Sequence, residues 1–234
     1  MQTQTAYTHS LVRTEQASSF LELASTDSGC AAFLGDESTV DPSIAPNIVQ
    51  AKIALRQSSL KVAALVNDPT RTEVVKHEAA QQLAERTVAQ LSESKKAIES
   101  RADYLFGEGV AQAEREFEPR ASHASLESEI RGWIREQASK TDGLSKIRAA
   151  MLEDKDVAAV IFHSPAFLVG INKDTRSKML FEVTQRWLPD AYKQMTGSIA
   201  LRDLAPKYDR VINSVRASFY NPAIAAQAAR RVEI

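Results

Sequence analysis

The fold of this chain is decided by residues 68–105, DPTRTEVVKHEAAQQLAERTVAQLSESKKAIESRADYL. Asp68 is suited to cap a helix and Pro69 to open it, and no further Gly or Pro interrupts the stretch. The pattern predicts one helix about 55 Å long, at about 1.5 Å per residue. The remaining elements must then pack against this helix.

A line of apolar residues, spaced alternately by four and three, runs along this predicted helix, and Lys95 is a polar break in it. Such a seven-residue period is typical of a bundle helix or of a self-associating coiled coil, and we favour the bundle. The line is also our predicted contact surface for other chains, together with Phe33 and Leu34. Its apolar members are Ala84, Val88, Leu91, Ile98, Ala102 and Leu105.

The segments before residue 68 predict a partner helix and an arm. A helix from Pro46 to Val66, followed by the sharp turn Asn67-Asp68-Pro69, should fold back as an antiparallel hairpin. Before it, a helix from Thr8 to Leu23 is expected to lead into a loop-rich arm, draped over this protein or a neighbour and anchored by Phe33 and Leu34. The predicted buried side of the 46–66 helix comprises Ile48, Val49, Ile53, Leu60, Ala63 and Ala64.

The segments after residue 105 predict shorter helices. Gly107-Glu108-Gly109 should interrupt the long helix as a hinge, Pro206 should open a new helix, and a last helix should span Ala223 to Arg231. No segment alternates with a period of two, so we predict an all-α fold. Its expected parts are an N-terminal helix and arm (1–47), a long hairpin (48–120) and a globular helical domain (121–234).

Composition excludes several classes of protein. The 29 basic and 30 acidic residues give a net charge of −1, which argues against a nucleic-acid backbone binder. No apolar run is long enough to span a membrane, and Met1 to Thr5 has no feature of a secretory signal. Cys30 stands alone, so no intramolecular disulfide forms. We expect synthesis in the cytoplasm without secretion.

Metal-binding patterns fail on spacing. His77-Glu78 begins like a zinc-protease helix, but Gln81 stands where the second histidine belongs. Glu73 lies four residues before His77, whereas di-iron bundles use a spacing of three, so we predict a solvated pair. The acidic run Glu114, Glu116 and Glu118 is interpreted as a charged helix end. We therefore predict no metal and no cofactor.

Nucleophilic patterns fail as well. Cys30 has no nearby histidine in the sequence, and His163 and Ser164 point about 100° apart if they share a helix. The short basic pairs Lys95-Lys96 and Arg230-Arg231 are diluted by carboxylates and are interpreted as solvated faces. We predict no catalytic residues.

The most apolar stretch, Val157 to Ile171, predicts the core hairpin of the C-terminal domain, cut by Pro165 and Gly170. Its second half, SPAFLVGI from Ser164 to Ile171, resembles a pattern in uncharacterised helical proteins of tailed bacteriophages and prophages. The pattern would have Ser where this chain has Val169. The resemblance implies a virion location, and it transfers no site residues.

These observations predict a non-catalytic structural or assembly protein, a capsid-, portal- or neck-associated virion component of a tailed bacteriophage. Its expected partners are further copies of itself or other structural proteins of the same assembly. One alternative is an assembly chaperone or adaptor that is absent from the mature particle. Another is a soluble helical enzyme whose site gathers scattered residues such as His163, Glu78 or Asp190.

Overall fold

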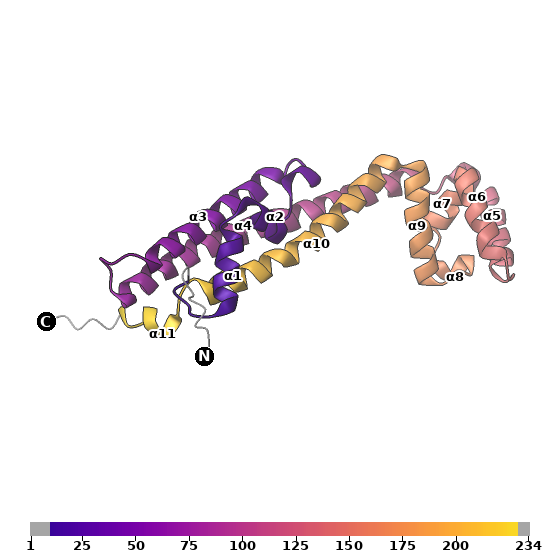
Figure 1. Ribbon diagram of the computed structural model, residues 1–234. Helices are drawn as coiled ribbons and strands as arrows, with labels where there is room; N and C mark the ends of the chain where they lie inside the picture. The colour runs from indigo at the N-terminus through magenta and orange to yellow at the C-terminus, as the bar shows by residue number, and fades with distance from the viewer. Residues whose placement is uncertain (1–9, 229–234) are drawn as a thin grey trace. The chain divides into compact units, whose positions relative to one another are not determined.

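The computed structural model describes residues 10–228, and its regular elements within that range are all helical (Figure 1). The predicted all-α class is therefore confirmed. The chain forms two compact units: unit 1 holds residues 1–102 and 199–234, and unit 2 holds residues 103–198. Two long helices, α4 (Glu73–Glu116) and α10 (Pro189–Ser218), contribute residues to both units. Thr8, where the first helix was predicted to begin, and Arg230-Arg231 lie outside the described residues.

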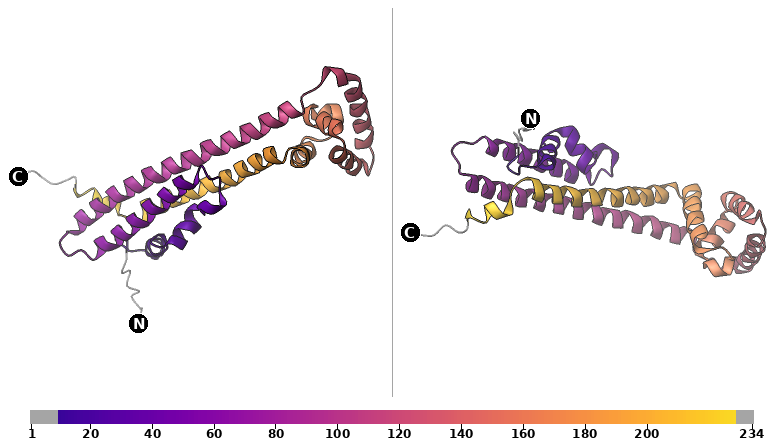
Figure 2. Two further views of the ribbon diagram at one scale, coloured as in Figure 1. Left: turned by 90° about the horizontal axis from the view of Figure 1, so that it is seen from above. Right: turned by 60° about the horizontal axis from the view of Figure 1, so that its bottom comes forward.

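Unit 1 is built on the predicted helical hairpin. The helices α3 (Ala45–Val66) and α4 run antiparallel, as Figure 2 shows. Thr87 Oγ1 donates to Ser58 Oγ at 2.8 Å, and Ser94 Oγ donates to the Asn47 carbonyl at 3.0 Å. In both bonds a residue later in α4 meets one earlier in α3, so the hairpin is confirmed.

The long helix begins later than the sequence predicted. Asp68 does not cap it: Asp68 Oδ1 accepts a bond from the Thr70 N–H at 2.9 Å and closes a turn. The first helical bond of α4 runs from the Lys76 N–H to the Thr72 carbonyl at 3.0 Å. A short Asp side chain often bonds the backbone two residues on, and here that turn competes with helix capping.

The long helix also ends later than predicted, because Gly107 and Gly109 do not interrupt it. A glycine inside a helix costs only about 1 kcal/mol, which packing can offset. A Cβ on Gly109 would lie 2.7 Å from Met195 Cγ, so the missing side chain permits close contact with α10. Pro206 likewise does not open a helix but lies inside α10.

The expected loop-rich arm is mostly helical, so that prediction was wrong. It forms α1 (Glu15–Ala24), α2 (Asp27–Leu34) and the 3₁₀ turn η1 (Glu37–Thr39). The turn-rich Ser25-Gly29 stretch ends one helix and starts the next, since Thr26 Oγ1 caps α2 by accepting from the Gly29 N–H at 3.0 Å. Both helices pack on α3, so the segment covers its own chain.

The C-terminal residues belong to unit 1, which moves the predicted domain boundaries. Unit 2 is residues 103–198, rather than 121–234. Apolar side chains of α10, including Tyr208 and Val215, are fully buried. The Tyr208 hydroxyl donates to the Leu34 carbonyl at 3.3 Å, which ties α10 to the end of α2. The short helix α11 (Pro222–Ala225) follows, capped by Asn221.

Unit 2 is a group of short helices around one apolar core. Its core includes both halves of the apolar stretch predicted to form a hairpin, as Ile161 and Val169 show. Gly170 takes the left-handed conformation (φ +69°) that reverses the chain after α8. The elements are η2 (Ala121–His123), α5 (Ala124–Ala138), α6 (Gly143–Glu153), α7 (Lys155–His163), α8 (Ala166–Val169) and α9 (Lys173–Trp187), with the adjoining parts of α4 and α10.

Candidate functional site

The residues predicted to contact other chains are mostly sealed inside this one, so that prediction was wrong. Phe33 and Val88 are half-buried, and Phe33 packs against Phe20 with ring centroids 5.4 Å apart. The stripe on α4 serves the intramolecular bundle because α3 and α10 flank α4 (Figure 2). The remaining predicted residues are at most 6% exposed: Leu34, Ala84, Leu91, Ile98, Ala102 and Leu105.

The apolar surface that stays open lies on α3 instead. Ile53 is 42% exposed and Leu60 is 48% exposed, although the sequence analysis placed both, with Ala64, on the buried side. The helix α3 has apolar residues on two faces. One face stays exposed, and the inner face packs into the core. That inner face carries Ile48, Ala51, Leu55, Val62 and Leu65. We call the line formed by half-buried Val49 and exposed Ile53, Gln57, Leu60 and Ala64 the α3 outer face.

Two depressions border the α3 outer face. One, of about 400 Å³, lies over the stretch from Val49 to Leu60 and reaches Asp27 and Glu37. The other, of about 490 Å³, lies between the ends of α3 and α4, and we call it the α3–α4 groove. Both volumes fall within the range of ligand sites. The apolar floor of the α3–α4 groove is formed by Ala64, Leu65, Ala79 and Leu83.

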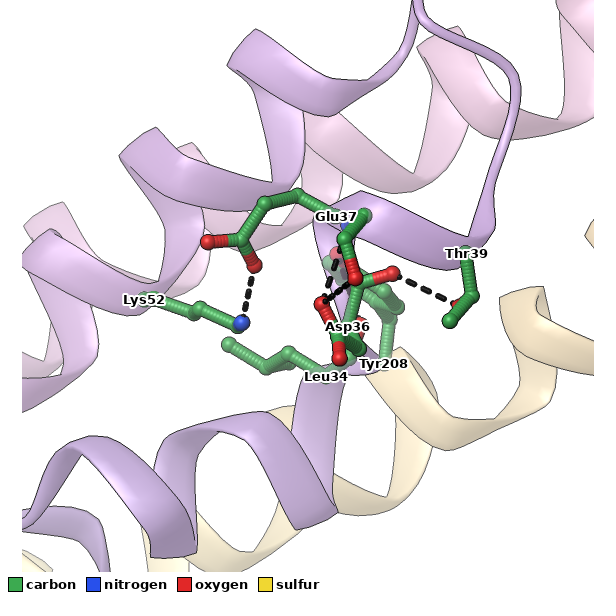
Figure 3. Close-up of polar contacts among 7 residues, drawn as sticks. Leu34, Asp36, Glu37, Thr39, Lys52 and Tyr208 are labelled. Carbon is green, nitrogen blue, oxygen red and sulfur yellow. Dashed lines mark hydrogen bonds and ion pairs between the residues drawn. The ribbon is translucent and has the colours of Figure 1, made fainter.

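Ion pairs between α3 and the N-terminal segments α2 and η1 lie at the first depression. Figure 3 shows Glu37 of η1 reaching Lys52 of α3, beside the contact between Tyr208 and Leu34. This bond from Lys52 lowers the pKa of the Glu37 carboxyl. Here the charges are already neutralised within the chain.

The α3–α4 groove has a different charge balance. Arg71 pairs with Asp68 at 3.2 Å. Lys61 and Arg86 line the same groove, and neither has an ion-pair partner within residues 10–228. The groove therefore combines an apolar floor with two exposed, uncompensated cations.

His77 is buried rather than solvated, which corrects the predicted Glu73–His77 surface pair. Its side chain is 0% exposed, and Nδ1 accepts a bond from the Asn221 N–H at 2.9 Å. Nε2 lies 3.4 Å from a Glu73 carboxylate oxygen. Burial lowers the pKa of His77 although Glu73 acts in the opposite direction. Across residues 10–228, no group of three or more His, Cys, Asp or Glu residues could hold a metal ion.

The residues of the enzyme alternative are divided between the two units. Glu78 belongs to unit 1, whereas His163 belongs to unit 2 and lies 3.6 Å from Glu127. Asp190 is exposed at the start of α10. Burial raises the pKa of the Cys30 thiol to about 11, and the thiol donates to the Ala24 carbonyl at 3.2 Å, so it is not a thiolate at neutral pH.

No protein-family model, curated protein or solved structure matches this chain. The resemblance carried by residues 164–171 stays a prediction. In the described part of the chain, no helix combines the length and the apolar character needed to cross a membrane. The α3 outer face and the α3–α4 groove together form the candidate site, which we interpret as a surface for binding another molecule.

Proposed function

We propose that this chain is a non-catalytic structural or assembly protein that acts through helix-mediated contacts with other proteins. The α3 outer face is the observation that carries the proposal. Exposed apolar residues rimmed by polar ones are typical of protein-binding surfaces. Here Ile53 and Leu60 lie in the open on a helix whose opposite side is already packed.

The roles of the buried ionisable groups support a non-catalytic protein. His77 accepts a bond from the backbone of Asn221, Tyr208 donates to the carbonyl of Leu34, and Cys30 donates to that of Ala24. Each of these groups connects two segments of the chain through a hydrogen bond to the backbone. An enzyme would instead gather several such groups around a pocket.

The finer proposal is a virion component of a tailed bacteriophage. It is supported by the resemblance of residues 164–171, and its partners would be further copies of this chain or other proteins of the particle. An assembly chaperone or adaptor would use the same kind of surface. The two differ in copy number, because an adaptor leaves before the particle matures.

The test is quantitative mass spectrometry of assembly intermediates and mature particles, purified on gradients from cells that encode this chain. A virion component is expected at a fixed molar ratio to the other particle proteins in the mature fraction. Presence in intermediates alone would replace the virion role with the adaptor role. Absence from all sedimenting fractions would refute both.

A further inference from the structure

The α3–α4 groove has the geometry of a seat for one more helix. Its α3 wall holds Lys61, Ala64 and Leu65, and Asp68 lines it from the turn after α3. Its α4 wall holds Ala79, Gln82, Leu83 and Arg86. Residues spaced in this way lie on one face of a helix. Because α3 and α4 are antiparallel neighbours, the two faces form a trough into which a third helix can pack.

The α3 outer face extends this trough along the helix. From Val49 to Ala64 the face covers 15 steps of the chain, or about 22 Å at 1.5 Å per residue. Ile53 and Leu60, two turns apart on it, supply the largest exposed apolar side chains. An occupant of about four helical turns would cover the line from end to end.

The charged side chains beside this trough indicate which kind of helix could bind in it. Lys61 and Arg86, which have no ion-pair partner within residues 10–228, stand on opposite walls of the groove. The carboxylates nearby, on Asp27, Glu37 and Asp68, are already paired with Arg56, Lys52 and Arg71. An occupant that places carboxylates at the edges of its apolar stripe would therefore satisfy both free cations.

We infer that the α3 outer face and the α3–α4 groove bind an acidic amphipathic helix of a partner protein. This inference rests on the proposed function and names the chemistry of the partner. A second copy of this chain fits less well, because symmetric pairing presents the same face twice. It would bring Lys61 and Arg86 of both copies together without adding a carboxylate for them.

The probe is a fluorescent synthetic peptide of about 18 residues with leucine and alanine along one face and glutamate along the flanks, which is long enough to cover the trough. Its twin carries lysine in place of glutamate. Anisotropy with the full chain should show saturable binding of the acidic peptide and much weaker binding of the basic twin. Equal binding of the two peptides, or none, would overturn the inference.

Variants of the chain locate the binding. The double variant Lys61→Glu/Arg86→Glu should weaken binding of the acidic peptide about tenfold, because two attractive contacts become repulsive. The matched control is Lys173→Glu/Lys178→Glu, which reverses two exposed lysines of unit 2 and should leave binding unchanged. A loss of binding in both double variants would mean nonspecific attraction and would refute the site.

The apolar line is tested separately. Leu60→Asp should weaken binding about tenfold or more, whereas Leu126→Asp, at a similarly exposed leucine of unit 2, should not. Circular dichroism melting verifies that each variant is folded. If Leu60→Asp unfolds the chain, the double variant Lys61→Glu/Arg86→Glu decides whether the peptide binds at this site. Sedimentation that shows self-association abolished by Leu60→Asp would assign the face to a second copy and overturn the inference. The particle measurements above would then still decide the proposed function independently.

Discussion

Replacement of Leu91 by alanine tests whether the seam of α4 is core or contact surface. Leu91 is 0% exposed, so the change removes buried methyl groups and leaves a cavity between packed helices. Leucine-to-alanine changes at such sites cost about 3 kcal/mol. With a urea dependence of about 2 kcal/mol per molar, the unfolding midpoint should fall by about 1.5 M.

Two optical probes can assign this loss to unit 1. Both tryptophans, Trp133 and Trp187, lie in unit 2, so their fluorescence follows unit 2 while far-ultraviolet circular dichroism follows the helices of both units. The midpoint seen by circular dichroism should shift more than the midpoint seen by fluorescence. The matched control is Leu60→Ala, which removes the same atoms from a half-exposed site and should cost less than about 1 kcal/mol. If Leu91→Ala is no more destabilising than Leu60→Ala, Leu91 does not belong to the core of unit 1.

Two further predictions concern backbone fit and pH. Gly109→Ala should destabilise the fold by about 1–3 kcal/mol, because its Cβ would clash with Met195. Gly107→Ala should stabilise the fold by up to about 1 kcal/mol, because a Cβ there would have nothing within 4 Å. Calorimetry that gives the same sign for both variants would contradict this prediction. Because burial lowers the pKa of His77, the unfolded state binds more protons, so stability should fall as the pH drops through about 6.5. His77→Asn keeps an acceptor for the Asn221 N–H and should lose that part of the pH dependence in melting experiments; an unchanged pH profile would refute the role of His77.

Periodicity predicted the class of fold and the hairpin, but it could not predict which surface stays open. On α3, Ile53 and Leu60 look as apolar as Ile48 and Leu55, and only the packing of α1, α2 and α4 decides which pair is covered. The seam on α4 was correctly identified as a stripe and wrongly assigned to other chains. An apolar stripe on a helix indicates that the stripe packs against another element. Here the packing elements belong to the same chain.

The sequence misplaced several elements because local composition does not report tertiary contacts and does not distinguish a helix cap from a turn. Gly109 was predicted to break a helix, yet its lack of a side chain is what lets Met195 approach. Pro206 was predicted to start a helix that in fact began at Pro189. Thr26 was assigned to a loop, because a cap between two short helices has the same composition as a turn.

Whether a partner covers the α3–α4 groove can be measured directly by the reactivity of Lys61, which lines that groove. Acetylation of surface lysines, followed by mass spectrometry, compares the free chain with the chain in its native assembly. Lys61 should become protected on assembly, while Lys178, an exposed lysine of α9 in unit 2, serves as the reference. Equal labelling of Lys61 in the free and assembled states would show that no partner covers the groove.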